Sequence, residues 1–189
     1  MHTRSFKRTA GLFSAGLFGM AILGAVIAQP AAASSAAVLT CNGLVVTINQ
    51  SVVVPTDSPG VDVILGTAGA DSIQAGNGND VVCGGGGNDV ITGGNGADWV
   101  SGGDGSDILT GGGGNDTIYG NDGADQLFGG DHNDILLAGE GNDAVRGEAG
   151  DDSMHCGAGV DNANGGTQTA GGADVLLPSD GCEVAVGLP

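Results

Sequence analysis

The chain has 189 residues, of which 40 are Gly and 5 are Pro, and it carries 22 acidic side chains against 4 basic ones, for a formal net charge of −18. Gly and Pro together make up about a quarter of the residues, which is close to the composition of low-complexity segments. So acidic a chain cannot neutralise phosphates, which excludes a nucleic-acid-binding protein. The length fits one domain of common size.

The N-terminal segment has the layout of a secretory signal peptide. Three basic residues come first: Arg4, Lys7 and Arg8. An apolar stretch follows over residues 12–27, and the A-x-A motif at 31–33 offers a cleavage site. We expect residues 1–33 to be removed during export. The alternative is an uncleaved membrane anchor, since the apolar stretch is just long enough for one.

Removal of this segment would change the balance of charge and aromatic residues. The remaining residues, 34–189, keep all 22 acidic side chains and one basic residue, Arg146, so their net charge is 1 − 22 = −21. Their only aromatic residues are Trp99, Tyr119 and Phe128. A chain of this composition cannot fold as an ordinary globular protein. Either a counter-charge neutralises it or it stays disordered.

A nine-residue repeat occupies residues 57–164. Gly lies two residues before the repeated Asp in eleven of twelve units, with His132 as the exception, and an apolar residue lies two residues after it. The units 84–92 (GGGGNDVIT) and 111–119 (GGGGNDTIY) fit the template G-G-x-G-x-D-x-U-x at every fixed position. Three columns that stay in phase throughout the repeat exclude a disordered Gly-rich linker. The repeated aspartates are Asp62, Asp71, Asp80, Asp89, Asp98, Asp107, Asp116, Asp125, Asp134, Asp143, Asp152 and Asp161.

These units resemble the RTX, or haemolysin-type, calcium-binding nonapeptide repeats of small exported bacterial proteins. The resemblance implies an all-β fold, a right-handed parallel β-roll of about twelve repeats with short terminal caps. It also implies six-residue turns, three-residue strands, two repeats per turn of the roll, and several Ca²⁺ ions, each between a loop and the loop two repeats later. The implied ligand residues are Asp71, Asp80, Asp89, Asp98, Asp107, Asp116, Asp125, Asp134 and Asp143, with Gly76, Gly78, Gly85, Gly87, Gly94, Gly96, Gly103, Gly105, Gly112 and Gly114.

Elementary chemistry agrees with this interpretation. Glycine adopts positive φ and lets main-chain carbonyls approach an ion closely, and calcium prefers six to eight oxygen ligands. The apolar residue two after each Asp would point inward and form a thin, repeated core. Tenfold excess of ligand over its dissociation constant stabilises a folded state by ~1.4 kcal/mol per site, so about eight independent sites would contribute on the order of 11 kcal/mol. We therefore expect disorder in chelator and folding in calcium.

The array has weak points towards its C-terminal end. His132 replaces a loop glycine, which indicates either a tolerated, strained turn or a weakened site at Asp134. Glu148 also replaces a glycine, Ala163 is small for a core position, and the period fails after Asp161. We expect the C-terminal repeats to bind calcium less well and to serve as atypical terminal repeats.

Four cysteines lie outside the signal segment, where an oxidising compartment permits disulfides. They allow three connectivities. The favoured one pairs Cys41 with Cys83 and Cys156 with Cys182, since it would attach a cap at each end of the roll and RTX-like proteins often show similar flanking cysteines. The expected segments are a signal peptide at 1–33, an N-terminal cap at 34–56, the calcium-binding roll at 57–164 and a C-terminal cap at 165–189.

Alternate repeats would build opposite faces of the roll, and one face is richer in apolar residues. Trp99 and Tyr119 lie on this face, on neighbouring rungs. Contiguous apolar surface often marks a contact site, so this face is a candidate for binding a glycan or a protein. The alternatives are that a terminal segment such as 38–54 covers it, or that its β-branched residues are good strand formers.

The pattern favours a secreted, extracellular calcium-binding protein with a structural or interaction role. Its alternative is a cell-surface adhesin or glycan-binding module that uses the face around Trp99 and Tyr119. A cell-envelope glycan or protein is a candidate partner, and no membrane contact is expected after signal cleavage. An enzyme is disfavoured, because the part of the mature chain outside the repeats is too short for a catalytic domain and neither HExxH nor G-x-S-x-G occurs. Ice binding is disfavoured too, since the loops lack a repeating Thr. Typical RTX proteins carry an uncleaved C-terminal export signal, whereas this chain has a cleavable N-terminal one.

Overall fold

The computed structural model describes residues 39–42, 44–46, 60–167, 174–176 and 182–184, and every regular element in them is a β-strand. No helix in this part of the chain is long and apolar enough to cross a membrane. The strands are β1 (Leu39–Cys41), β2 (Leu44–Val46), β3 (Val63–Leu65), β4 (Ser72–Asn77), β5 (Val81–Gly86), β6 (Val90–Asn95), β7 (Trp99–Asp104), β8 (Ile108–Gly113), β9 (Thr117–Asp122), β10 (Gln126–Asp131), β11 (Ile135–Glu140), β12 (Ala144–Ala149), β13 (Ser153–Ala158), β14 (Asp161–Asn164), β15 (Val175–Leu176) and β16 (Cys182–Val184).

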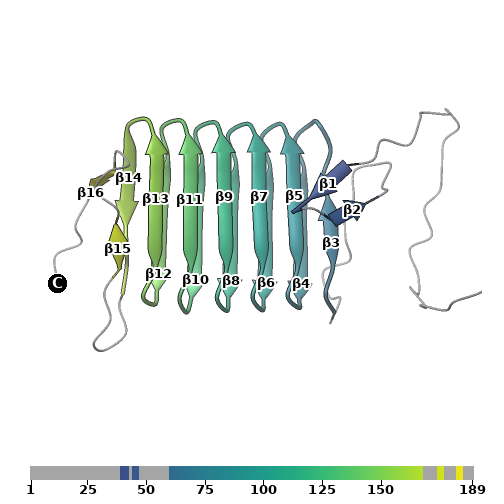
Figure 1. Ribbon diagram of the computed structural model, residues 1–189, viewed down its shortest axis with the longest axis horizontal. Coiled ribbons are helices and arrows are strands. Elements are labelled where there is room, and N and C mark those ends of the chain that lie inside the picture. The colour runs from purple at the N-terminus through teal and green to yellow at the C-terminus, as the bar shows by residue number, and fades with distance from the viewer. Residues whose placement is uncertain (1–38, 43, 47–59, 168–173, 177–181, 185–189) are drawn as a thin grey trace, which may run out of the picture. The chain divides into compact units, whose positions relative to one another are not determined.

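The strands after β2 alternate between two parallel sheets, as Figure 1 shows. The odd sheet has the order β15-β13-β11-β9-β7-β5-β3, and the even sheet has the order β16-β14-β12-β10-β8-β6-β4. Each strand pairs with the strand two repeats along the chain, as in the register Val82↔Val100 and Ile91↔Leu109. Two repeats therefore make one turn, and the fold is the expected parallel β-roll of about six turns.

The core is a ladder of the apolar residues that follow each Asp by two positions. These side chains alternate with outward neighbours, as the period of two in a strand requires. All are between 0% and 3% exposed: Ile64, Ile73, Val82, Ile91, Val100, Leu109, Ile118, Leu127, Leu136, Val145, Met154 and Ala163. Each rung contacts the next, so a small apolar residue per repeat suffices for a continuous core.

The strands are longer than the sequence predicted. Most have six residues and include the first three residues of the following loop, so that β6 contains Val90-Ile91-Thr92 and then Gly93-Gly94-Asn95. The ladder continues through the glycines, since Gly94 pairs with Gly112. Equivalent loops stack in register along the roll, which lets their main-chain groups pair. The turn proper is correspondingly short.

The sheets also extend past the nine-residue array. The array supplies β3 to β14, and β15 and β16 add a seventh strand to each sheet. Asp174 substitutes for the next repeated Asp, although it lies further along the chain than the period requires. Its Oδ1 accepts the main-chain N–H of Asp152 at 3.0 Å. The edge strands at this end are therefore the short β15 and β16, and a short edge strand limits pairing with another chain.

Both favoured disulfides are present, Cys41–Cys83 and Cys156–Cys182. The first joins the antiparallel hairpin β1–β2 to β5 of the odd sheet. Leu65, in register with Cys83, is only 6% exposed. The second joins β13 of the odd sheet to β16 of the even sheet, across the C-terminal end of the roll. Each closes a loop of a few dozen residues, worth roughly 3–4 kcal/mol in the chain-entropy account.

Candidate metal centre

A column of buried aspartates runs along each edge of the roll, where one strand turns into the next. Ten of these carboxylates, from Asp80 to Asp161, are 1–3% exposed. Oδ1 of each accepts the main-chain N–H of the Asp one turn earlier, as in Asp80 to Asp98 and Asp98 to Asp116, both at 2.8 Å. One carboxylate oxygen of every rung is thus fixed by the backbone of its neighbour.

The other carboxylate oxygen is buried without a hydrogen-bond donor. This holds for Oδ2 of Asp62, Asp80, Asp89, Asp98, Asp107, Asp116, Asp125, Asp134, Asp143, Asp152 and Asp161. A buried charged oxygen without a partner costs several kcal/mol or drives the group to take up a proton. An array of such oxygens therefore needs a cation or protons.

Burial raises the pKa of the nine repeated aspartates from Asp80 to Asp152. Loss of hydration raises the pKa of Asp134 to about 7, even though the N–H of Asp116 opposes the shift; the carboxylates of Asp116, Asp152 and Asp131 add to it. Burial likewise raises the pKa of Asp125 to about 6. Ionisation of these side chains therefore costs more in the metal-free roll than in the unfolded chain, unless a counter-charge lies beside them.

In the repeats that begin with glycine, a main-chain carbonyl converges on the same place as Oδ2. A methyl group built on Gly84 would lie 2.6 Å from the carbonyl oxygen of Gly102 and closer still to Oδ2 of Asp89. At Gly111 it would lie 2.7 Å from the carbonyl oxygen of Gly129 and collide with Oδ2 of its own repeat. We call this space, between a repeat's Oδ2 and the first carbonyl of the repeat one turn later, the cradle of that repeat.

The donor set fits calcium. No group of three or more His, Cys, Asp or Glu side chains within the described residues is arranged to hold a metal ion. A site here would combine one carboxylate per loop with main-chain carbonyls, all hard oxygen ligands, which is the combination that Ca²⁺ accepts. The ion would supply the positive charge that the buried Oδ2 atoms lack.

The predicted ligand residues lie in the loops and in the aspartate column, and Asp71 differs from the other aspartates. All ten predicted glycines have positive φ, such as Gly85 at 110° and Gly87 at 101°. Eight of the nine predicted aspartates have an unpaired Oδ2. Asp71 differs, because its Oδ2 accepts hydrogen bonds from the N–H of Thr67 at 2.6 Å and from its hydroxyl at 2.9 Å.

Sequence reasoning missed the first residue of each repeat. Its carbonyl lines the cradle of the repeat one turn earlier, and where the residue is glycine, its lack of a side chain keeps its own cradle open. Asp152 was also left out, although its Oδ2 is as buried and unpaired as the others. The signal was available, since Gly recurs at this position in every repeat from Gly84 to Gly129.

Comparison with known families agrees with this geometry. Residues 57–91, 92–127 and 128–163 each match a model of four copies of the RTX calcium-binding nonapeptide repeat. The chain belongs to this RTX repeat family. The three matches cover most of the chain and the same residues as strands β3 to β13. A search of the curated proteins found no match. The family match and the buried, unpaired carboxylates therefore both indicate calcium binding.

Proposed function

We propose that this RTX protein is exported and folds outside the cell by binding several calcium ions, and that the folded roll has a structural or interaction role. The observation that carries this proposal is the column of buried, unpaired Oδ2 atoms. Each rung adds a carboxylate that is unfavourable in the metal-free roll and favourable once a cation lies beside it.

The proposed ligands are the column carboxylates and the loop carbonyls. They are drawn from the predicted aspartates between Asp71 and Asp143, with Asp152 added, from the second- and fourth-position glycines, and from the first-position carbonyls. Calcium binding couples to folding because the two sides of a cradle come from repeats one full turn apart, which meet only in the roll. Low calcium inside the cell would keep the chain unfolded for export.

Residues 1–33 lie outside the described residues, and their role as a signal peptide belongs to this proposal. The two disulfides support an oxidising destination. Expression of the full chain in a bacterium that exports through the general secretory route, followed by mass spectrometry of the medium, tests this. The proposal expects a secreted species that begins close to residue 34. Retention of the intact chain in the membrane would favour the anchor instead.

The proposed role is non-catalytic. A β-roll of this kind is built from rungs whose buried polar groups are committed to hydrogen bonds and to cations. Neither the HExxH motif of zinc proteases nor the G-x-S-x-G motif of serine hydrolases occurs in the sequence.

Equilibrium dialysis against calcium measures the binding claim directly. The chain should bind several Ca²⁺ ions, lose them to a chelator, and retain them in excess Mg²⁺, because Mg²⁺ demands a rigid octahedral shell and keeps its water. Binding of no calcium by a correctly oxidised chain would refute the proposal.

A second candidate role rests on an aromatic pair. The rings of Trp99 and Tyr119, on neighbouring strands of the odd sheet, lie 5.2 Å apart between centroids. Both side chains are half-buried, so each presents part of its ring to solvent. Flat aromatic surface of this kind suits a sugar ring or a protein contact. The double variant Trp99→Ala/Tyr119→Ala should lose binding to cell-envelope material, whereas Phe128→Ala, on the outer face of the even sheet, should not. Equal binding by both variants would remove this role.

A further inference from the structure

The first residue of each repeat determines how much room a cation has beside the aspartate of that repeat. A methyl group built on Gly93, Gly111 or Gly129 would lie 2.9, 2.7 or 2.6 Å from the carbonyl oxygen one turn further along. It would also collide with Oδ2 of its own repeat. Glycine therefore keeps the cradle open, because carbon and oxygen atoms do not approach so closely without a bond.

Two repeats have alanine at this position. Gln74 and Gly76 pair with Thr92 and Gly94, so Ala75 lies level with Gly93. In the same way Ala138 lies level with Gly120. Each alanine thus carries a methyl group at a position where the neighbouring strand has none. Both alanines are 0% exposed and belong to the hydrophobic core. The methyl groups thus extend the core into the loop.

The aspartates of these two repeats are otherwise normal members of the column. Oδ1 of Asp80 and of Asp143 accepts the usual main-chain N–H, at 2.7 and 2.8 Å, and their Oδ2 atoms are buried and unpaired. The cradle residue is therefore the feature that separates them from their neighbours. Asp71 is set apart for another reason, since Thr67 already saturates its Oδ2.

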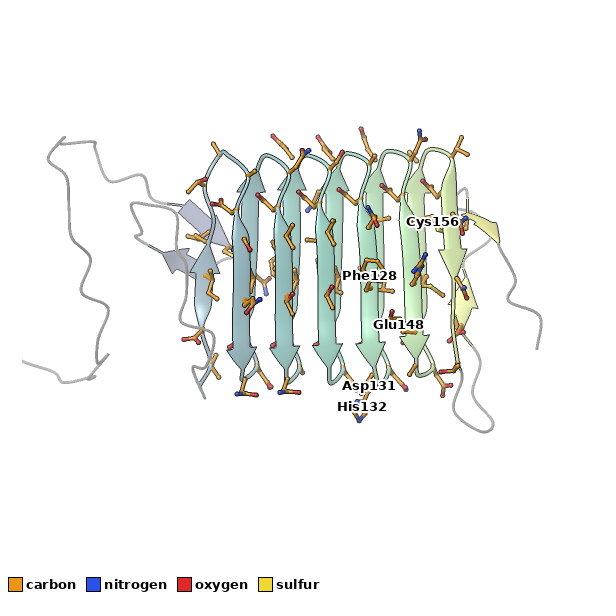
Figure 2. All side chains as sticks on the ribbon, turned by 180° about the vertical axis from the view of Figure 1, so that it is seen from behind. Phe128, Asp131, His132, Glu148 and Cys156 are labelled. Carbon is orange, nitrogen blue, oxygen red and sulfur yellow. A yellow bond between two sulfur atoms is a disulfide. The ribbon has the colours of Figure 1, made fainter. Side chains whose placement is uncertain are left out.

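The cradle of the last repeat, that of Asp161, is filled by a disulfide. The first residue of this repeat is Cys156, which is 0% exposed and bonded to Cys182 (Figure 2). A disulfide is bulkier than a methyl group, and this one occupies the cradle position of Asp161. The Cys156–Cys182 disulfide at the C-terminal end of the roll thus takes the place of a cation.

We propose that the calcium sites of the roll are unequal, and that the side chains of Ala75, Ala138 and Cys156 close the cradles of their repeats. This inference rests on the proposed calcium binding and specifies its stoichiometry. Seven repeats combine an open cradle with an unpaired Oδ2. They are the repeats of Asp89, Asp98, Asp107, Asp116, Asp125, Asp134 and Asp152.

Closing an open cradle tests the steric claim. Gly111→Ala should bind one calcium ion fewer than the seven of the parent chain in equilibrium dialysis. Gly113→Ala is the matched control, because a methyl group there has only an ordinary contact, 3.4 Å from Oδ1 of Asn95. The control should bind all seven ions.

Opening a closed cradle tests the claim in the opposite direction. Ala138→Gly should bind eight ions, whereas Ala124→Gly, at an exposed loop position, should bind seven. Glycine in a strand weakens the fold, so a merely structural effect of Ala138→Gly would lower calcium binding and not raise it. The Ala138→Gly experiment remains informative if Gly111→Ala fails to fold.

The outcomes separate this inference from the function on which it rests. A parent chain that binds no calcium overturns both. A parent chain that binds several ions, with no ion lost in Gly111→Ala and none gained in Ala138→Gly, overturns the unequal sites and leaves the calcium-dependent roll in place.

Discussion

His132 and Glu148 have backbone conformations that most repeats reserve for glycine, with φ of 85° and 74°. Figure 2 shows both on the same side of the roll, with His132 at the outer edge of its loop beside Asp131. A side chain with positive φ costs roughly 1–2 kcal/mol because Cβ crowds the neighbouring carbonyl. His132→Gly and Glu148→Gly should therefore each raise the free energy of unfolding of the calcium-loaded chain by about 1 kcal/mol, measured by urea denaturation.

Asn121 provides the control for this prediction. It also has positive φ, at 77°, but Asn adopts this conformation more readily than other residues. Its Nδ2 donates a hydrogen bond to the hydroxyl of Ser101 at 3.0 Å, which glycine would remove. Asn121→Gly should thus change stability little. An equal gain in all three variants would show that strain at His132 and Glu148 is not the cause.

The raised pKa of the column aspartates predicts the pH dependence of the metal-free roll. A carboxyl group with a higher pKa in the folded state than in the unfolded chain binds its proton preferentially in the folded state. Asp134, with a pKa of about 7, therefore stabilises the metal-free roll below pH about 4, and this stabilisation is lost as the pH rises through about 7. Protons and calcium both stabilise the folded roll at this site, so the calcium concentration at half-folding should fall as the pH falls from 7.5 to 5.5.

Asp134→Asn tests the assignment of this effect. It should lose one calcium ion and part of the pH dependence, whereas Asp104→Asn, which removes an exposed acid that does not act on Asp134, should change neither. A calcium midpoint that does not depend on pH would contradict the raised pKa.

The strands depend on one inward side chain each. Leu109 on β8 is 0% exposed and lies between Ile91 and Leu127 in the ladder of the even sheet. Leu109→Ala should destabilise the calcium-loaded chain by about 2–5 kcal/mol, because it leaves a cavity in a core only one side chain wide. Ile108→Ala, at the 39% exposed neighbouring position, should cost much less. Thermal unfolding in excess calcium measures both.

At the scale of elements, the period of nine and the resemblance to RTX repeats together predicted the fold. The period indicated which residues point inward, and the resemblance implied that each strand pairs with the strand two repeats later and that alternate repeats build separate sheets. Strand length was wrong, because a single chain segment does not reveal that stacked glycine loops such as Gly94 and Gly112 continue the ladder. The extra strands β15 and β16 were also missed, since the long interval before Asp174 hides the pairing.

The sequence was sufficient to predict which residues line the candidate site, but not which of their oxygen atoms are free to bind a cation. Spacing identified the aspartate column, but it could not show that one oxygen of each carboxylate is taken by a main-chain N–H while the other is left unpaired. The hydroxyl of Thr67 at Asp71 and the methyl group of Ala138 depend on contacts between side chains and loops. Such contacts are set by three-dimensional packing and leave no period in the sequence.

The whole molecule is dominated by its charge. In addition to the buried column, Asp104, Asp122 and Glu140 lie in register on three neighbouring strands and are exposed. The only basic residue from position 34 onward, Arg146, lies over the ring of Phe128, 5.5 Å from its centroid, and neutralises little of this charge. Seven cations at tenfold excess over their dissociation constant would stabilise the roll by on the order of 10 kcal/mol, comparable to the whole stability of a typical domain.

Far-ultraviolet circular dichroism of the oxidised chain, first in chelator and then with calcium added, tests this account most directly. We predict a disordered spectrum in chelator at pH 7.5 and a cooperative change to a β spectrum as calcium is added. A native β spectrum that persists in chelator would contradict the claim that the folded roll depends on calcium.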